Sequence, residues 1–294
     1  MFQQWLSAFS LPCDLFRWVG NTANSLEHVL ASHSLASADG GPVTGSPPDP
    51  HVSLVGALAV SGLYLFSVLV ASFAQVSAKP KEMPRFKFFY NALQMIVCSY
   101  MAVEAVLCAI DSGYVFMACN SHVPVSSRIS RLYCLFYFSK LLDFCDTALI
   151  VVGKKWEQLS FLHLLHHSGS FVMTALMLKV TNNIELLSTV GVNTFVHFLT
   201  YTYFFVASHL GHGSTVWWKR HVLRAELLQF FVLLVHLVVF PLSCNLKGEE
   251  LDKATQRGRV AAIYWYSVQF ALFTHFWWKR HGGKEHKQQK AKAG

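Results

Sequence analysis

Long apolar segments alternate with short polar connections over most of this chain. From residue 52 onward, seven segments each approach the length of about 20 residues that a helix needs to cross a bilayer core of about 30 Å. No soluble domain fits between them. The segments span 52–75, 88–110, 132–152, 157–178, 183–208, 222–243 and 259–278. The pattern therefore predicts an all-α membrane protein with seven transmembrane helices.

Composition and charge placement agree with a membrane protein. Hydrophobic residues make up 53% of the 294 residues and charged residues 14%, with a mean hydropathy of +0.36. A net charge of +8 would also suit a nucleic-acid-binding protein, but Lys and Arg lie mostly in short connections and in the C-terminal tail. That placement indicates membrane topology and anionic groups at the surface. We expect no nucleic-acid partner.

The connections predict the domain organisation and the orientation. Residues 1–51 are expected to form an N-terminal lumenal tail and linker, 52–279 the seven-helix domain, and 280–294 a basic cytosolic tail. Fifteen Lys and Arg residues fall on the side of the C-terminal tail and eight on the other side. The positive-inside rule then places the C-terminus in the cytosol and the N-terminus in the lumen.

Ionisable side chains lie well inside the third and fourth segments. In a bilayer such groups are costly, so they should face a protein or water-filled interior and serve a function there. The three histidines, spaced i, i+3 and i+4, share one helical face. The residues concerned are Lys140, Asp143 and Asp146 in the third segment, and His163, His166 and His167 in the fourth.

Polar residues of the other segments fall at a similar depth. With a rise of about 1.5 Å per residue, the hairpin cluster lies roughly 10–15 Å below the cytosolic face. The lumenal halves are mostly apolar, which predicts that helices two to seven form a ring around a substrate tunnel, polar toward the cytosol and apolar toward the lumen. The other polar residues of this layer are Asn91, Gln94, His197, Tyr201, Tyr203, Glu226, Gln229 and His275.

Two kinds of chemistry suit an H-x-x-H-H cluster. Imidazole is a good ligand for iron or zinc, as in membrane di-iron desaturases and hydroxylases, but those enzymes use several His boxes and this chain has one. Alternatively, imidazole titrates near neutral pH, can be oriented by a carboxylate and can form a covalent acyl intermediate. The second interpretation is favoured, with no metal expected. A seven-helix transporter or receptor is a further alternative, against which the buried ionisable cluster argues.

Several motifs together resemble one family, the ELO family of very-long-chain fatty acid elongases, which are membrane 3-ketoacyl-CoA synthases. The resemblance covers roughly residues 79–280, with Asp143 standing where the family usually has Glu and Glu226 where it usually has Gln. The matching motifs are Tyr90-Asn91-x-x-Gln94, Lys140-x-x-Asp143-x-x-Asp146-Thr147, Lys154-Lys155-Trp156, His163-x-x-His166-His167, and Asn193-x-x-x-His197 followed by Tyr201-x-Tyr203.

The resemblance implies a reaction and a location. A long-chain acyl-CoA and malonyl-CoA would condense to a 3-oxoacyl-CoA, CO₂ and CoA, with these two CoA esters as substrates and no cofactor. The expected location is the endoplasmic reticulum membrane, where Lys290-Ala-Lys292-Ala-Gly294 fits the K-x-K-x-x retrieval signal. The expected partners are membrane lipid and the other enzymes of the elongation cycle: a ketoreductase, a dehydratase and an enoyl reductase.

The resemblance also implies roles for individual residues. His166 is expected to act as nucleophile or base, and His197 to stabilise the negative charge formed after decarboxylation. The supporting catalytic residues are His163, His167, Asp143, Asp146 and Lys140. The expected substrate-binding residues are Asn193, Tyr201, Tyr203 and Gln229 near the reacting groups, and Lys154, Lys155, Lys219 and Arg220 for the CoA phosphates.

The seven cysteines show no zinc-type spacing. Two of them, Cys119 and Cys244, fall on the predicted lumenal side, where oxidation is permitted. They are a candidate disulfide that would tie the connection before the third segment to the sixth.

Overall fold

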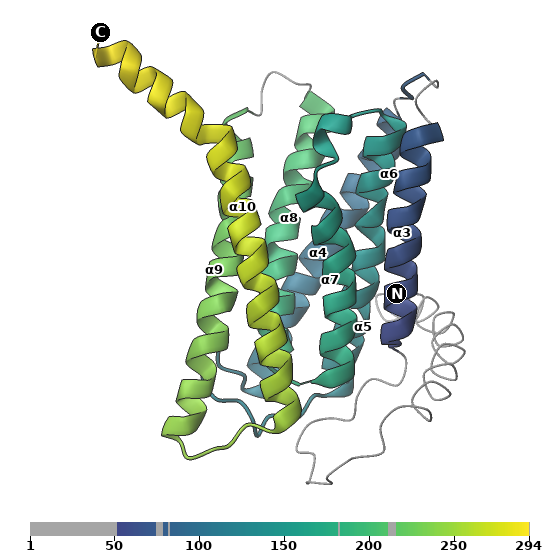
Figure 1. The fold of residues 1–294 in the computed structure, drawn as a ribbon. Coiled ribbons are helices and arrows are strands. Elements are labelled where there is room, and N and C mark those ends of the chain that lie inside the picture. Colours follow the sequence, from purple (N-terminus) through teal and green to yellow (C-terminus); the bar gives the residue numbers. More distant parts are fainter. Residues whose placement is uncertain (1–51, 75–78, 82, 182, 211–215, 294) are drawn as a thin grey trace.

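The computed structural model describes residues 52–74, 79–81, 83–181, 183–210 and 216–293. The predicted N-terminal tail and linker, 1–51, lie outside the described residues. The described residues are helical apart from short connections, and the long helices lie side by side with their axes roughly parallel (Figure 1). The helices are α3 (Leu54–Ala74), α4 (Pro84–Ser112), α5 (Ser127–Leu142), α6 (Phe144–Val152), the 3₁₀ turn η1 (Trp156–Gln158), α7 (Phe161–Val180), α8 (Leu186–Leu210), α9 (Val216–Leu246) and α10 (Lys253–Ala293).

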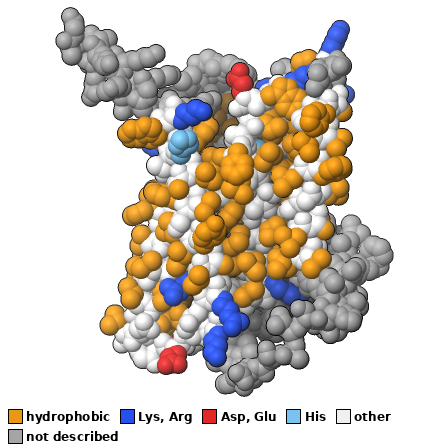
Figure 2. All heavy atoms as spheres, in the orientation of Figure 1, with side chains coloured by type: hydrophobic (Ala, Val, Ile, Leu, Met, Phe, Trp, Pro, Cys, Tyr) orange, Lys and Arg blue, Asp and Glu red, His pale blue; other side chains and the backbone are white. Residues whose placement is uncertain are grey.

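Five of the described helices are long and apolar enough to cross a membrane. These are α3, α4, α7, residues 186–208 of α8 and residues 221–246 of α9. Hydrophobic side chains cover the middle of the bundle in Figure 2, and most of the Lys and Arg side chains visible on this face lie toward the two ends. Exposed aromatic and aliphatic side chains in such number need a lipid environment, since a soluble monomer rarely exposes a continuous apolar surface of this size. The chain is a multi-pass membrane protein.

The third predicted segment is not one continuous helix. It is split at Asp143 into α5 and α6, although Asp143 keeps helical backbone angles (φ −60°, ψ −23°). The amide of Asp146 donates to the Asp143 carbonyl at 3.2 Å, an i+3 bond that tightens the turn as in a 3₁₀ helix. The prediction of an unbroken helix over 132–152 is therefore wrong at this residue, which lies among the polar groups described below.

The beginnings of α5 and α7 are fixed by serine N-caps. The Ser126 hydroxyl accepts from the amide of Ile129 at 3.3 Å, and the Ser160 hydroxyl accepts from the amide of His163 at 3.1 Å. Each bond satisfies one of the amides that a helix leaves unpaired in its first turn. The Ser160 cap places His163 in the first turn of α7, with His166 and His167 one turn further into the helix.

Neighbouring helices pack in a regular order. Helix α4 packs along α8, α8 on α9, α9 on α10, α10 on α7, α7 on α5, and α5 on α4, while α3 packs against α7 and α6. Helices α7 and α10 approach closely at Gly169, where a Cβ atom would lie 2.2 Å from the Trp265 ring. Beyond the predicted seventh segment, which ends at residue 278, α10 continues to Ala293 and projects away from the bundle (Figure 1).

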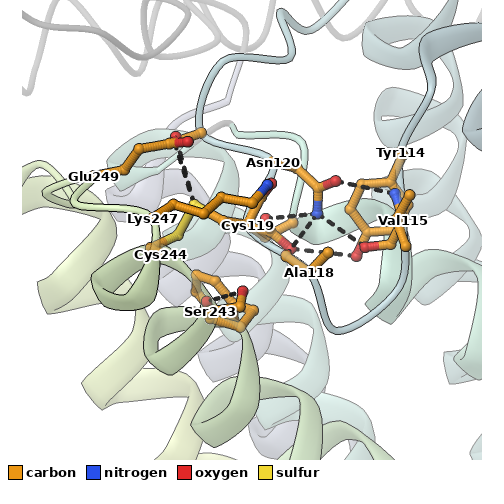
Figure 3. The surroundings of a disulfide bond; sticks show 12 residues. Tyr114, Val115, Ala118, Cys119, Asn120, Ser243, Cys244, Lys247 and Glu249 are labelled. Carbon is orange, nitrogen blue, oxygen red and sulfur yellow. Dashed lines mark hydrogen bonds between the residues drawn. A yellow bond between two sulfur atoms is a disulfide. The ribbon is translucent and has the colours of Figure 1, made fainter.

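A disulfide closes the end of the bundle opposite the histidines. Cys119, in the connection between α4 and α5, is bonded to Cys244 near the end of α9, which confirms the predicted pair (Figure 3). The Lys247 ammonium donates to the Cys119 carbonyl at 3.4 Å, and the Asn120 side chain accepts from the Val115 amide at 2.9 Å. The bond therefore fixes a folded connection to the end of α9.

This end also holds a buried polar group that the sequence did not predict. The Glu185 carboxylate accepts from the Tyr114 hydroxyl at 3.2 Å and from the Asn120 amide at 3.1 Å, and lies 3.3 Å from Nε2 of His236. Burial, and secondarily the Glu185 charge, raises the pKa of Tyr114 above its usual range, so its phenol stays protonated and can donate. The expectation that the half of the bundle away from the histidines is mostly apolar is therefore incomplete, because the connection after α4, the residue before α8 and His236 on α9 bring polar groups there.

Candidate active site

His166 lies in the wall of a small cavity. Its Nδ1 is 3.2 Å from Oε1 of Gln269 on α10, and its ring centroid lies 6.4 Å from that of His197 on α8. The rings of Phe230 and Phe273 contact it at centroid distances of 6.2 and 5.5 Å. The predicted meeting of His166 and His197 is thus observed, and three helices besides α7 supply the surroundings of His166.

The other two histidines of the cluster lie on the side of α7 toward α6. Nε2 of His163 is 2.8 Å from the Thr147 hydroxyl, which lies 2.7 Å from the Tyr64 hydroxyl of α3. The His167 ring lies between the other two, 4.3 Å from that of His163 and 5.5 Å from that of His166. Among the histidines that the structure describes, His166 is the one that lines the cavity.

His197 is oriented by its own helix. Its Nδ1 lies 3.0 Å from the backbone carbonyl of Asn193, one turn earlier, and a carbonyl can only accept, so Nδ1 carries the proton. Its Nε2 then faces Oδ2 of Asp143 at 3.8 Å. This arrangement keeps Nε2 directed toward the polar cluster rather than toward the helix backbone.

Lys140 and Asp143 form a buried pair, 5% and 4% exposed. The Lys140 ammonium lies 3.4 Å from Oδ2 of Asp143, donates to Oδ1 of Asn193 at 2.8 Å, and lies 4.7 Å from the centre of the Phe136 ring. A buried charge without a partner is very costly, so each member of this pair requires the other. The Asp143 side chain, although shorter than Glu, reaches its partner.

A hydrogen-bonded layer connects both aspartates to α4 and α8. The Tyr201 hydroxyl donates to Asp146 at 2.6 Å, and Gln94, which is fully buried, donates to Asp143 at 3.0 Å. The Tyr90 hydroxyl lies 3.4 Å from that of Tyr201. Asp146 was expected to orient an imidazole, but its described hydrogen bond is to Tyr201. Gln94 was predicted to lie in the polar layer and Tyr90 to belong to the same motif, but neither was given a catalytic or binding role.

The cavity measures about 40 Å³, which is space for about three water molecules. The polar side chains in its lining are those of Lys140, His166, Ser170, Thr174, Thr189, Asn193, Gln229 and Tyr266. Asn193 donates to Gln229 at 3.3 Å, so α8 and α9 are joined at this point. The remaining wall is largely apolar and includes Met173, Met177, Leu186, Leu233 and Trp265. Beyond His166, α7 contributes both polar and apolar side chains to the wall, Ser170 and Thr174 with Met173 and Met177.

Not every predicted residue joins this cluster. Tyr203 instead contacts the ring of Trp218 at a centroid distance of 6.4 Å, and His275 is exposed. Lys154 and Lys155 lie in the connection between α6 and η1, half-buried. The side chains of Lys219 and Arg220 lie outside the described residues.

Gln269 was missed entirely. It is fully buried on α10, in a stretch from residue 260 to 273 that is otherwise almost wholly apolar. A lone amide in such a stretch is costly unless it has a buried partner, and that contrast was a usable signal. Within the described part of the chain, no group of three or more His, Cys, Asp or Glu side chains has the arrangement needed to hold a metal ion.

A comparison with known protein families shows which family this chain belongs to. The profile of the GNS1/SUR4 family, abbreviated ELO, matches residues 50–291. The chain belongs to the ELO family. The resemblance inferred from the motifs is thereby confirmed, and the ELO motifs of α5–α6, α7 and α8 are the ones that meet at the cavity.

Individual ELO members are related over different lengths. "Very long chain fatty acid elongase 2" of Mus musculus is 30% identical over 149 residues, which is 50% of this chain and 51% of that protein, so the match spans about half the length of this relative. "Very long chain fatty acid elongase 1" of Mus musculus is 26% identical over 86% of this chain and 88% of its own length. "Very long chain fatty acid elongase 7" of Rattus norvegicus is 29% identical over 75% and 78%.

Proposed function

We propose that this ELO-family protein is a very-long-chain fatty acid elongase, a 3-oxoacyl-CoA synthase. It condenses a long-chain acyl-CoA with malonyl-CoA and forms CO₂, CoA and a 3-oxoacyl-CoA two carbons longer. Family membership and the names of the relatives support the reaction class. The observation that carries the assignment to this site is the position of His166, which lines the cavity together with Lys140 and Asn193 and lies 6.4 Å from His197 on another helix.

His166 acts on the acyl thioester as nucleophile or base, and either role needs an unprotonated Nε2. Loss of CO₂ from malonyl-CoA leaves an enolate whose carbon attacks the acyl carbonyl, so a C–C bond replaces the acyl bond to CoA. CoA leaves as the thiolate and takes up a proton. The Lys140 ammonium stabilises the negative oxygens of these steps, because charge stabilisation in a site shielded from water is strong. For His197 to do the same, its Nε2 must take up a second proton, since Nδ1 already donates to the Asn193 carbonyl.

The acyl chain is proposed to lie in a tunnel within a ring of helices two to seven, which are α4, α5–α6, α7, α8, α9 and α10. The order of helix neighbours supports this ring. A cavity of about 40 Å³ cannot hold a long acyl chain, so binding requires its lining to move. Met173 and Met177 suit that movement, because methionine side chains are flexible and adapt their packing.

The histidine end is proposed to face the cytosol, with the protein in the endoplasmic reticulum membrane. Malonyl-CoA would then reach the site from the cytosolic side. Lys154 and Lys155 bind the CoA phosphates there, together with Lys219 and Arg220. Asn193, Tyr201 and Gln229 support the reacting groups. The 3-oxoacyl-CoA product passes to a ketoreductase, a dehydratase and an enoyl reductase in turn.

Purified protein in liposomes, with malonyl-CoA labelled at C2 and a series of acyl-CoA chain lengths, tests this function. We expect labelled 3-oxoacyl-CoA, with release of one CO₂ per product. Folded protein that gives no malonyl-dependent product at any chain length would overturn the proposal. Stoichiometric iron together with a desaturated or hydroxylated product would identify a di-iron enzyme instead.

A further inference from the structure

Gln269 is a buried residue whose side-chain amide has a hydrogen-bond partner at its oxygen but not at its nitrogen within the described residues. It is 0% exposed, and its Oε1 lies 3.2 Å from Nδ1 of His166. Its Nε2 is buried and has no hydrogen-bond partner within the described residues. A buried donor without a partner is destabilising. An apolar residue of similar shape would avoid this cost, so packing alone does not account for an amide at this position.

The contact determines which nitrogen of His166 is free to react. An amide oxygen can only accept a hydrogen bond, so Nδ1 of His166 must carry the proton, and in the neutral ring Nε2 then holds the lone pair. Nε2 of His166 makes no hydrogen bond within the described part of the chain, and the residue lines the cavity. The tautomer that the condensation needs is therefore the one that Gln269 favours.

Among the histidines described above, His166 is the one whose ring nitrogen is bonded to a glutamine side chain. His197 uses a backbone carbonyl of its own helix for the same purpose, and His163 is bonded through Nε2 to Thr147. The rings that contact His166 are those of Phe230, Phe273, His167 and His197, none of which forms a hydrogen bond with it. Without Gln269, the ring could turn over or adopt the other tautomer.

We propose that Gln269 is a positioning residue of the condensation, which holds Nδ1 of His166 as a donor and leaves Nε2 free toward the cavity. The inference rests on the proposed role of His166. Gln269 is not among the residues that line the cavity, so it acts through His166 and not on the substrate. Its removal should therefore lower kcat and leave the KM values for both CoA esters unchanged.

The test compares Gln269→Met with Gln269→Glu in the full-length protein. Methionine keeps the length of the side chain and removes the amide oxygen, so we expect kcat to fall at least about tenfold, the size of effect seen when partners that orient a histidine are removed. A Glu carboxylate accepts from Nδ1 in the same way and should retain more activity than Met. Tyr264→Leu, on the same helix with Tyr264 73% exposed, is the matched control and should keep full activity.

Three outcomes would overturn the inference: wild-type kcat in Gln269→Met, equal losses in the Met and Glu variants, or a loss that lies in KM. Thermal melting of each purified variant identifies a protein that has simply failed to fold. His166→Asn, assayed in parallel, separates the two proposals. An inactive His166→Asn beside a fully active Gln269→Met defeats the positioning role alone, whereas a fully active His166→Asn defeats the role of His166 itself.

Discussion

The imidazole rings of His166 and His197 lie 6.4 Å apart, centroid to centroid, and are inclined by 26°, although they belong to two different helices, α7 and α8. This separation is smaller than the diameter of one helix with its side chains, about 10 Å. Two rings so close can act on the two carbonyl groups that a condensation brings together. Their hydrogen-bond partners differ in origin: Gln269 of α10 lies 3.2 Å from Nδ1 of His166, and the Asn193 carbonyl of α8 lies 3.0 Å from Nδ1 of His197.

Loss of the Asp143 charge should destabilise the protein strongly. Asp143→Asn leaves the buried Lys140 ammonium without its counter-charge, which typically costs about 3–5 kcal/mol. We expect a markedly lower melting temperature and no condensation activity. Adding Lys140→Met to Asp143→Asn removes the unpaired charge and should recover much of the melting temperature but none of the activity. If the double variant melts below Asp143→Asn, the two charges are not coupled as described.

A methyl group at Gly169 should disturb the contact between α7 and α10. An added Cβ would lie 2.2 Å from the rigid Trp265 ring, so the ring or the helix must shift. Overpacking of this kind costs about 1–3 kcal/mol, and Trp265 also lines the cavity. We expect Gly169→Ala to lower both the melting temperature and the rate. Gly62→Ala, where nothing lies within 4 Å of the added Cβ, is the control; equal behaviour of the two variants would contradict the prediction.

The disulfide should stabilise the end of the bundle far from the histidines. Cys119 and Cys244 are 125 residues apart in the chain, and loss of such a link costs about 2–5 kcal/mol. Cys119→Ser, Cys244→Ser and the double variant should therefore melt at the same reduced temperature and lose the mobility shift on non-reducing gels. Cys134→Ser, at a free cysteine, should keep that shift. Alkylation of Cys119 in the unreduced wild type would show that the bond is absent.

Loss of the Thr147 hydroxyl should affect stability more than catalysis. Thr147→Val leaves Nε2 of His163 and the Tyr64 hydroxyl without this partner, which costs about 1–3 kcal/mol when such groups are buried. The reacting groups lie around His166, so kcat should change by only a few-fold. Melting curves and initial rates of the same preparation measure both effects. A rate as low as that of His166→Asn would mean that His163 takes part in the reaction directly.

The apolar pattern predicted most of the helices because each needs a run of residues long enough to cross the membrane. The split at Asp143 was not predictable in this way. Both halves are helical and apolar, and the break is a single tightened turn at a residue whose side chain is held by Lys140 and Gln94. The spacing of apolar residues predicts which face of a helix is buried. It does not predict a change in backbone hydrogen bonding at a single residue.

The site was predictable where ionisable groups were unusual for their surroundings, as with His166 and Lys140. Gln269 was harder to find because an amide carries no charge and this residue belongs to none of the motifs, whereas Gln94 lies in the motif of the second segment. Tyr203 shows the opposite error: it belongs to the same motif as Tyr201, but it lies two residues away on the helix and contacts Trp218 instead. A sequence motif identifies a helix, whereas the partners of each side chain depend on packing between helices.

The most direct test of the account is the condensation rate of His166→Asn beside wild type, in one liposome preparation with labelled malonyl-CoA and a long-chain acyl-CoA. Asparagine retains a polar side chain but removes the nitrogen that acts on the thioester. The account predicts a folded protein, with a melting temperature close to that of wild type, that forms no detectable 3-oxoacyl-CoA. A His166→Asn protein that forms 3-oxoacyl-CoA at the wild-type rate would contradict it.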